Sequence, residues 1–310
     1  MKCMISKEQI CYIRAKLKND YVFDAIKNAG FYTFIPYKDY CLFFRLLREV
    51  WIRLDLPFKA IWYNKKYQKI NPDVIILGDP LITPHYIEWL HKQTPDAKLI
   101  LIYENRAEQT INPQNVPRYV NRWSYDLDDC KKYGMNKTHS NYFDIYSIES
   151  NNNDIKYDIL YLGRDKGRME QLLRYKECFE EIGLSTYFHI CADRSFLRMK
   201  NRHYKRVLPY TDYLELLKKS RAILNIVPQG QKSITQRELE AVFDNKKCIT
   251  NNEGILDFDL YDKSRYFILG QDDIDDLRTF LYTEFKPVDK DVLDNYTFES
   301  VIELIVTGSL

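Results

Sequence analysis

The stretch that decides the fold lies in the second half of the chain and reads Tyr157-Asp158-Ile159-Leu160-Tyr161-Leu162, followed by Gly163-Arg164-Asp165-Lys166-Gly167-Arg168. The apolar run is typical of a buried strand, and the helical pattern over 169–182 predicts that a helix follows the loop. A helix N-terminus already carries about half a positive charge. Cations placed there are expected to surround an anion, because strand, glycine turn and helix N-terminus are how α/β proteins bind phosphate.

Within this loop we expect Gly163, Lys166 and the two arginines, Arg164 and Arg168, to contact a diphosphate. Gly163 is free to adopt a positive φ where the strand ends, and arginine forks match phosphate oxygens. The alternative is a solvated loop whose cations pair with Asp165 and Glu170.

A second stretch repeats the arrangement: Ala222-Ile223-Leu224-Asn225-Ile226-Val227 predicts a buried strand, and a Gln/Gly turn follows it. Thr235-Gln236-Arg237-Glu238 then matches a capping box and predicts a helix start. Arg237 and Glu240 are three residues apart and share a helix face. We expect Glu240 on the exposed face, where its carboxylate accepts two ribose hydroxyls, with donors from Gln231, Ser233 and Thr235. The alternative is an Arg237–Glu240 surface pair, which contributes under about 1 kcal/mol.

Short apolar runs alternate with helical patterns along the whole chain, which indicates parallel sheets with helices on both faces. In the first half we predict strands near 10–14, 31–35, 73–77 and 98–102, and helices near 20–29, 39–52, 84–92 and 126–133. In the second half we predict strands near 157–162, 185–190, 221–227, 247–250 and 265–269, and helices near 168–182, 211–220, 235–244 and 272–283. The expected fold is α/β, with two Rossmann-like domains whose parallel sheets face a cleft.

A polar stretch from Ser147 to Asp154 is the best candidate for a linker between the domains. We therefore expect an N-terminal Rossmann-like domain over 1–150 and a C-terminal one over 151–290. A C-terminal helix within 291–310 is expected to return toward the N-terminal domain. Ligands of such sheets bind beyond the carboxyl ends of the strands, so we expect the ligand there, facing the cleft.

The composition of the 310 residues, 45% hydrophobic and 29% charged, is that of a globular protein. A formal charge of +2 is too balanced to indicate nucleic acid as the main partner. Seven scattered cysteines without a CxxC pair fit a reducing compartment. The start of the chain lacks a secretory apolar region, and no apolar stretch approaches the roughly 20 residues of a membrane span. We expect a cytoplasmic protein, at most peripheral on the inner face of the cell membrane.

The positive charge is concentrated in residues 38–69, and the segment 40–67 mixes these cations with aromatic residues. Such a helix can lie on an anionic membrane, which would hold the protein near a lipid-linked substrate. The other interpretation, which we prefer from the sequence, is a core helix whose arginines are solvated.

Several motifs together resemble a known family. They are Tyr161-Leu162-Gly163-Arg164-Asp165-Lys166-Gly167-Arg168, Ser220-Arg221-Ala222-Ile223-Leu224, Gly230-Gln231, Thr235-x-Arg237-x-x-Glu240-Ala241 and Lys246-Lys247-Cys248-Ile249-Thr250-Asn251-Asn252. Over about 155–270 the chain is similar to bacterial glycosyltransferases of the GT-B fold, found in lipopolysaccharide core and exopolysaccharide biosynthesis. The first half matches loosely, through 73–77 and Trp123-Ser124-Tyr125-Asp126.

The resemblance implies that the C-terminal domain binds a nucleotide-sugar donor and the N-terminal domain binds a glycan or lipid-linked acceptor. It places donor contacts at Gly163, Arg164, Lys166, Gln231, Thr235, Arg237 and Glu240. It implies no cofactor. The five histidines show no ligand spacing, and we assign no metal.

One departure from the family concerns mechanism. Retaining GT-B enzymes carry two glutamates eight positions apart, and with Glu240 as the second, the first position is occupied by Lys232. The retaining mechanism therefore cannot be carried over, and an inverting transfer needs a general base near the acceptor hydroxyl. The candidates are Asp79, then Glu104, then Asp20, each in a loop after a predicted strand. For Asp79 the alternative is an ordinary turn residue before Pro80.

Three functional hypotheses follow. The preferred one is transfer of a sugar from a nucleotide-sugar donor to a growing glycan. The second is a sugar-nucleotide epimerase on the same scaffold, which needs no acceptor. The third is a non-catalytic, degenerate transferase that acts as an assembly partner, which the missing glutamate at Lys232 keeps open.

Overall fold

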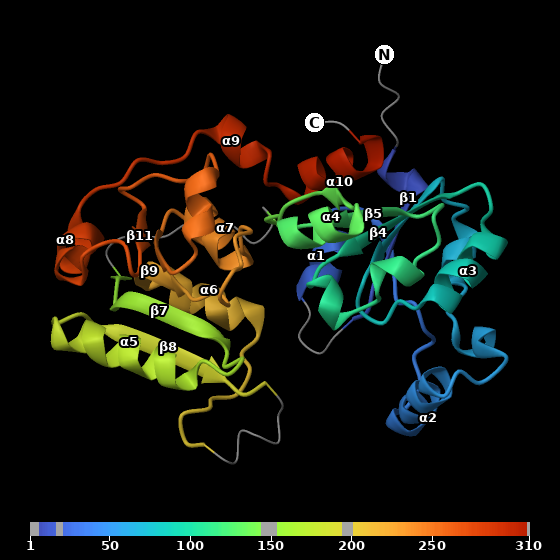
Figure 1. Ribbon diagram of the computed structural model, residues 1–310, viewed down its shortest axis with the longest axis horizontal. Coiled ribbons are helices and arrows are strands. Elements are labelled where there is room, and N and C mark those ends of the chain that lie inside the picture. The colour runs from blue at the N-terminus through green and yellow to red at the C-terminus, as the bar shows by residue number, and fades with distance from the viewer. Residues whose placement is uncertain (1–5, 17–20, 144–153, 194–200, 309–310) are drawn as a thin grey trace. The chain divides into compact units, whose positions relative to one another are not determined.

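The computed structural model describes residues 6–16, 21–143, 154–193 and 201–308. The chain forms two compact units (Figure 1): the first unit consists of Met1–His139 and Ile302–Leu310, and the second unit of Ser140–Val301. The predicted linker, except Asp154, lies outside the described residues, as does Asp20.

The first unit contains a six-stranded sheet in which every neighbouring pair of strands is parallel. Across the sheet the strands follow the order β2 (Tyr32–Phe34), β1 (Ile10–Ile13), β3 (Val74–Gly78), β4 (Lys98–Tyr103), β5 (Asn121–Ser124) and β6 (Asn136–Lys137). The helices of this part of the chain are α1 (Tyr21–Asn28), α2 (Leu42–Arg53), α3 (Pro84–Gln93) and α4 (Leu127–Tyr133).

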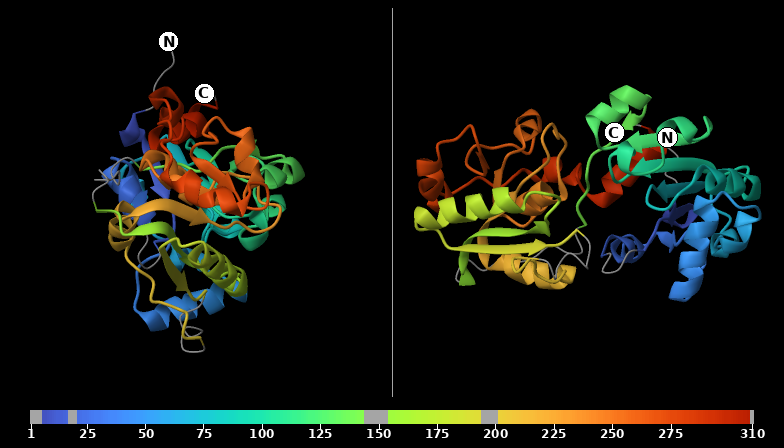
Figure 2. Two further views of the ribbon diagram at one scale, coloured as in Figure 1. Left: turned by 90° about the vertical axis from the view of Figure 1, so that its left-hand side faces the viewer. Right: turned by 60° about the horizontal axis from the view of Figure 1, so that its bottom comes forward.

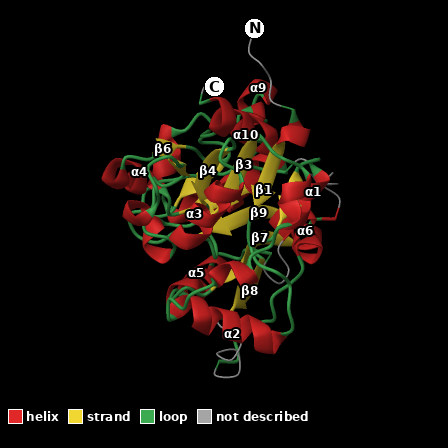
Figure 3. Ribbon diagram, turned by 90° about the vertical axis from the view of Figure 1, so that its right-hand side faces the viewer, coloured by secondary structure: helices red, strands yellow, loops and turns green. Residues whose placement is uncertain are grey.

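The strands of the first unit are apolar on both faces, as expected for a parallel sheet covered on two sides. All of Val74–Gly78 is buried. Cys11, Ile75 and Leu99 share a core with the apolar face of α3, which Figure 3 shows beside the strands. This packing fixes the register of β1, β3 and β4, and hence the place where each strand ends.

The second unit contains a five-stranded sheet, again with all neighbouring pairs parallel. Its order is β11 (Tyr266–Ile268), β10 (Lys247–Thr250), β9 (Ser220–Asn225), β7 (Tyr157–Arg164) and β8 (Thr186–Cys191). The helices that follow these strands are α5 (Met169–Glu181), α6 (Tyr210–Lys218), α7 (Gln236–Phe243), α8 (Leu277–Tyr282), α9 (Lys290–Asp294) and α10 (Phe298–Thr307).

Helices cover both faces of this second sheet, and α5 and α6 lie on opposite sides of it (Figure 2). Side chains alternate along β7, so that Leu160 packs with α6 and α7 while Ile159 and Tyr161 pack with α5 and α8. The loops that leave the carboxyl ends of the strands are therefore held from two sides.

The two sheets have the same topology, because in each the first strand lies between the second and the third. The strand order thus reverses between β1 and β3 in the first unit and between β7 and β9 in the second. Ligands of open parallel sheets bind at such switch points, beyond the carboxyl ends of the strands.

The structure confirms the predicted α/β fold with two Rossmann-like domains built on parallel sheets. It adds β5 and β6, which the sequence analysis did not predict as strands, and it divides the C-terminal segment into α9 and α10. The first unit ends at His139 and resumes at Ile302, so that Ile302–Leu310 also belongs to it. The cleft between the domains stays a prediction.

The expectation of a core helix with solvated arginines within 40–67 is right only in part. Trp51 and Ile52 pack against the core, and Arg45 and Arg53 are exposed. On α2 the arginine Arg48 is buried, whereas Phe43, Leu46 and Val50 are exposed. Periodicity detects that a helix has an apolar stripe but does not tell which side faces the protein. None of the helices in the described part of the chain is long and apolar enough to cross a membrane.

Candidate functional site

Arg168 occupies the switch point of the second sheet. It is the residue before α5, and its guanidinium donates hydrogen bonds to the carbonyl of Arg164 at the end of β7 (3.2 Å) and to the carbonyl of Ile226 just beyond β9. A third bond runs from its Nε to the carbonyl of Asp165 (3.2 Å). The arginine therefore connects the ends of two neighbouring strands, at the position where a ligand is expected.

The two other predicted cations lie in the same loop. Arg164 donates to the carbonyl of Asp193 (2.5 Å), and the backbone N–H of Lys166 donates to the Asp193 carboxylate (3.0 Å). Desolvation and the neighbouring positive charge of Arg168 lower the pKa of Lys166. An anion bound at this loop would offset that repulsion.

The glycine of this loop acts differently from our expectation. The left-handed backbone occurs at Lys166 (φ 48°) and Gly167 (φ 76°), not at Gly163. At Gly163 a Cβ atom would lie 2.9 Å from the hydroxyl of Tyr161, so a larger residue would have to displace that hydroxyl. Gly163 thus shapes the end of β7 through packing.

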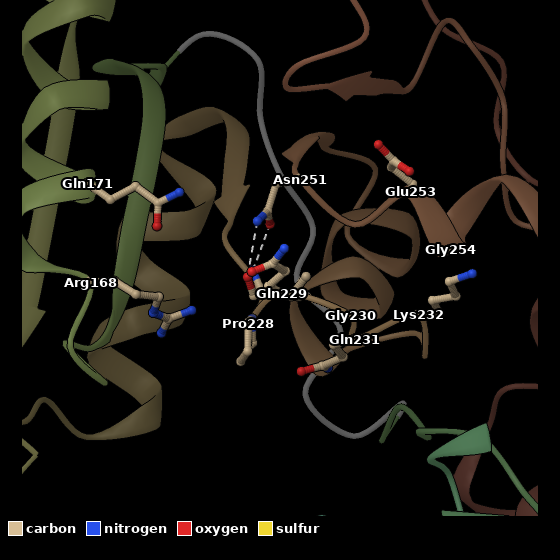
Figure 4. A pocket seen from close by; sticks show the side chains of 11 residues that line it. Arg168, Gln171, Pro228, Gln229, Gly230, Gln231, Lys232, Asn251, Glu253 and Gly254 are labelled. Carbon is tan, nitrogen blue, oxygen red and sulfur yellow. Dashed lines mark hydrogen bonds between the residues drawn. The ribbon is translucent and has the colours of Figure 1, made fainter. Parts of the chain in front are cut away.

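A pocket of about 640 Å³ opens beside Arg168, lined by α5 and by the loops that follow β9 and β10 (Figure 4). Arg168 and Gln171 project into it from the α5 side, and Asn251 lies opposite. Asn251 exchanges two hydrogen bonds with the backbone of Val227 (2.7 and 3.0 Å), which fixes the start of the β9 loop. The remaining lining residues are Pro228, Gln229, Gly230, Gln231, Lys232, Glu253 and Gly254.

Two sequence predictions meet in this pocket. Gln231, predicted to contact a donor, lines it together with Lys232, the residue eight positions before Glu240. Gly254 closes the pocket wall, because a Cβ atom there would come within 2.2 Å of the carbonyl oxygen of Lys232. The close approach of these two loops gives the pocket its shape.

The start of α7 confirms the predicted capping box. The Thr235 hydroxyl accepts from the N–H of Glu238 (3.3 Å), and the Glu238 carboxylate accepts from the N–H of Thr235 (2.7 Å). Burial raises the pKa of Glu238, whose carboxylate also accepts from the Asn252 amide (3.0 Å). Thr235 is therefore a structural cap, and a donor contact from it stays a prediction.

The expected exposure of Glu240 is wrong, because its side chain is fully buried. It accepts hydrogen bonds from the hydroxyls of Tyr210 (3.1 Å) and Tyr213 (2.6 Å) on α6, and it pairs with the guanidinium of Arg237. Arg237 also stacks on the ring of Tyr213, 4.0 Å from the centroid. The tyrosines turn this carboxylate inward, so contact with ribose hydroxyls would require these bonds to be replaced.

In the first unit, the two candidate bases lie together at the other switch point. Asp79 follows β3 and accepts a hydrogen bond from the N–H of Glu104 (3.0 Å), which follows β4. The Glu104 carboxylate pairs with Arg14, which follows β1, through bonds of 2.7 and 3.1 Å. Three strand ends thus contribute one charged residue each.

The two carboxylates differ in accessibility. Asp79 is 1% exposed, whereas the side chain of Glu104 is 23% exposed. Burial, followed by the negative charge of Glu104, raises the pKa of Asp79 to about 7. A carboxyl group with such a pKa is suited to accept a proton near neutral pH, but Glu104 is the one that a bound hydroxyl reaches more easily.

Arg14 is the residue that the sequence analysis missed, whereas Arg168 was expected among the cations of its loop. Arg14 is 90 positions from Glu104, and no local pattern links them. Arg168 does have a signal, since it ends the same basic loop as Arg164 and Lys166. In the described ranges, no group of three or more His, Cys, Asp or Glu is arranged to hold a metal ion.

No family model and no curated protein matches the chain. Solved structures share its fold: the lipopolysaccharide outer core galactosyltransferase WaaB in its apo form is 13% identical, with a TM-score of 0.53 over 97% of this chain and 99% of that one. AviGT4, a glycosyltransferase involved in avilamycin A biosynthesis, is 12% identical, with a TM-score of 0.58 over 96% of each chain. A putative UDP-N-acetylglucosamine 2-epimerase from Listeria monocytogenes is 10% identical, with a TM-score of 0.50 over 97% and 95%. The chain has the two-domain α/β fold of the GT-B glycosyltransferases.

Proposed function

We propose that this protein is a glycosyltransferase that moves a sugar from a nucleotide-sugar donor to a glycan or lipid-linked acceptor in bacterial surface polysaccharide biosynthesis. The observation that carries the proposal is Arg168, held by main-chain carbonyls at the switch point of the second sheet and facing a pocket of about 640 Å³. The fold shared with the galactosyltransferase WaaB and the glycosyltransferase AviGT4 supports the same activity.

The second unit binds the donor in this proposal. Arg168 and Lys166 contact the phosphate groups, and Gln231 contributes a neutral polar contact from the opposite loop. When the acceptor oxygen attacks the anomeric carbon, the bond to the phosphate oxygen breaks and the nucleotide leaves with the electron pair. Fixed cations at the leaving group stabilise that charge where it develops, which is usually the largest contribution to such a reaction.

The first unit binds the acceptor. An inverting transfer needs a group that takes the proton of the acceptor hydroxyl. Glu104 is the better-placed candidate because it is partly exposed and oriented by Arg14, and Asp79 behind it holds the Glu104 backbone. A retaining transfer would not need this base. The anomeric configuration of the product, together with the activity of Glu104→Gln, therefore distinguishes an inverting from a retaining transfer.

The epimerase hypothesis keeps specific support from the fold shared with the Listeria monocytogenes protein. It needs the same donor pocket and no acceptor. Incubating the sugar nucleotide alone and following the sugar by NMR distinguishes the two activities: an isomerised sugar without any acceptor supports the epimerase, and unchanged donor supports the transferase.

The first experiment is a thermal-shift panel of uridine, guanosine, cytidine and adenosine diphosphates and their sugar conjugates. At a ligand concentration of about 100 times Kd, binding adds about 2.7 kcal/mol, so we expect Tm to rise by about 5–10 °C for the cognate base. Arg168→Lys is expected to reduce this shift. If no nucleotide raises the Tm of the wild type, the donor site is refuted and the non-catalytic alternative gains support.

A further inference from the structure

Helix α2 directs an apolar stripe away from the unit to which it belongs. Phe43, Leu46, Leu47, Val50 and Leu54 recur at helical spacing, so they line one side of the helix and its C-terminal end. Phe43 is 69% exposed, Leu46 54% and Val50 52%. Contiguous exposed apolar side chains of this kind mark an interaction surface.

The side of α2 that faces the unit carries Arg48, Trp51 and Ile52. Arg48 is 9% exposed and lies over the ring of Tyr37, with 4.6 Å between the guanidinium carbon and the ring centroid. Trp51 donates to the carbonyl of Pro57 (2.8 Å), and Ile52 packs against the core. The helix thus has its own tertiary contacts, and its apolar stripe is not needed for them.

The segment after α2 also exposes large apolar side chains. Phe58 is 79% exposed and Ile61 is 49% exposed. Phe58 has a φ of 60°, a left-handed conformation that is rare for a bulky residue and is strained. A strained residue that exposes its ring to water is unexpected unless the ring has a binding partner.

The positive charge of this region favours an anionic partner. Residues 38–69 contain eight Lys and Arg and three Asp and Glu, a net charge of +5, whereas the whole chain has +2 and the remainder therefore −3. Exposed cations on α2 are Arg45 and Arg53, and others in the same basic region are Lys65, Lys66 and Lys69. Exposed apolar side chains flanked by cations are the chemistry of a helix that lies in the surface of an anionic bilayer.

We infer that α2 and the segment 54–61, which stand at the edge of the first unit in Figure 1, form a docking surface for an anionic lipid bilayer. The side chains of Phe43, Leu46, Val50 and Phe58 enter the boundary between head groups and acyl chains. Arg45 and Arg53 contact lipid phosphates. This inference is independent of the proposed transferase activity, because it concerns only the surface of the first unit.

Vesicle flotation of the full chain tests the docking surface. We expect binding to vesicles of phosphatidylcholine with about 30% phosphatidylglycerol, little binding to phosphatidylcholine alone, and weaker binding as salt rises. Val50→Gln should reduce the partition coefficient several-fold, and Phe43→Gln with Leu46→Gln should abolish measurable binding. Val207→Gln is the matched control, since Val207 is 50% exposed in the second unit. This variant should bind the vesicles as the wild type does.

A charge series gives a second test that does not touch the stripe. Arg45→Glu with Arg53→Glu should lower binding to the anionic vesicles at least about tenfold, whereas Lys263→Glu with Lys290→Glu should not. Wild-type binding by both the stripe and the charge variants would overturn the inference. So would failure of the wild type to bind anionic vesicles, or a concentration-dependent dimer that Leu46→Gln dissociates, which would identify a second copy of the chain as the occupant.

Discussion

The guanidinium of Arg168 donates a hydrogen bond to the main-chain carbonyl of Ile226, and so joins the beginning of α5 to the end of β9. The arginine is therefore held by the backbone of the sheet. A ligand that binds beside it meets a cation whose position is already fixed, which lowers the entropic cost of forming the contact.

Replacing this arginine tests the donor site. Arg168→Lys keeps the charge but loses the fork, and it leaves the carbonyls of Arg164 and Ile226 without their partner. We expect nucleotide affinity to fall by about 10- to 150-fold, the range for hydrogen bonds to charged groups. Isothermal titration with the nucleotide that gives the largest thermal shift measures the loss.

The matched control is Arg221→Lys. Arg221 also bridges two strands, through an ion pair with Asp158 (3.3 Å), but at the amino ends of β9 and β7. Its replacement should leave nucleotide affinity unchanged. Equal losses in the two variants would show that the effect of Arg168 is a general one on the sheet.

Asp79 predicts a specific dependence of stability on pH. Because its folded-state pKa of about 7 lies above the ordinary value of 3.8, the folded protein holds this proton more tightly than the unfolded chain does. The resulting stabilisation is complete below pH 3.8 and is lost as pH rises through 7. Asp79→Asn should remove this slope and, at pH 8, raise the free energy of unfolding by up to about 4 kcal/mol, from about 1.36 kcal/mol per pKa unit.

Urea unfolding of the wild type and of Asp79→Asn between pH 4.5 and 8 measures this difference. The two stability curves should converge at the acid end and separate toward neutrality. Parallel curves over the whole interval would show that Asp79 does not carry the titration.

The pair formed by Arg237 and Glu240 predicts a loss of stability. Glu240 is fully buried. In Arg237→Ala the Glu240 carboxylate keeps its hydrogen bonds from the tyrosine hydroxyls but loses its guanidinium partner. Removing one partner of a buried pair costs about 3–5 kcal/mol. Arg174→Ala on α5 breaks an exposed pair with Glu170 and should change stability little. Thermal and urea unfolding compare the two, and similar small effects would contradict the buried pair.

Gly254 predicts that the pocket depends on close packing of two loops. An added Cβ atom would meet the backbone of Lys232 at 2.2 Å, so Gly254→Ala must displace the loop that follows β9. We expect a loss of about 1–3 kcal/mol in stability and a larger relative loss of nucleotide binding. Asp257→Ala is the control, because this exposed side chain lies close by in the sequence but is not among the residues that line the pocket. Full binding by Gly254→Ala would place the ligand elsewhere.

The central strands could be predicted from the sequence because burial on both faces leaves a continuous apolar run, as in Val74–Gly78. The edge of the first sheet could not. Strand β5 reads Asn-Arg-Trp-Ser and β6 only Asn-Lys, and both are strands because β4 and β5 offer them backbone partners, such as Ile102 for Trp123. Pairing between distant segments decides these strands, and it leaves no periodicity in the sequence.

The candidate site divides in the same way. The capping box at Thr235 and Glu238 is local and was predicted, whereas the burial of Glu240 depends on two tyrosines about one helix and one strand earlier in the chain. The orientation of α2 also escaped prediction, because an apolar stripe has the same spacing whether it faces a core or a partner.

The discontinuity of the first unit has a consequence for its biogenesis. Residues from Ile302 onward belong to it, with Ile305 buried and the carbonyl of Val306 accepting a hydrogen bond from Lys98 (2.7 Å). The second unit, in contrast, is one uninterrupted segment. During translation most of the first unit is synthesised before the second unit. Its last residues, however, are synthesised after the whole second unit. The second unit can therefore complete its fold first, which reverses the order of synthesis.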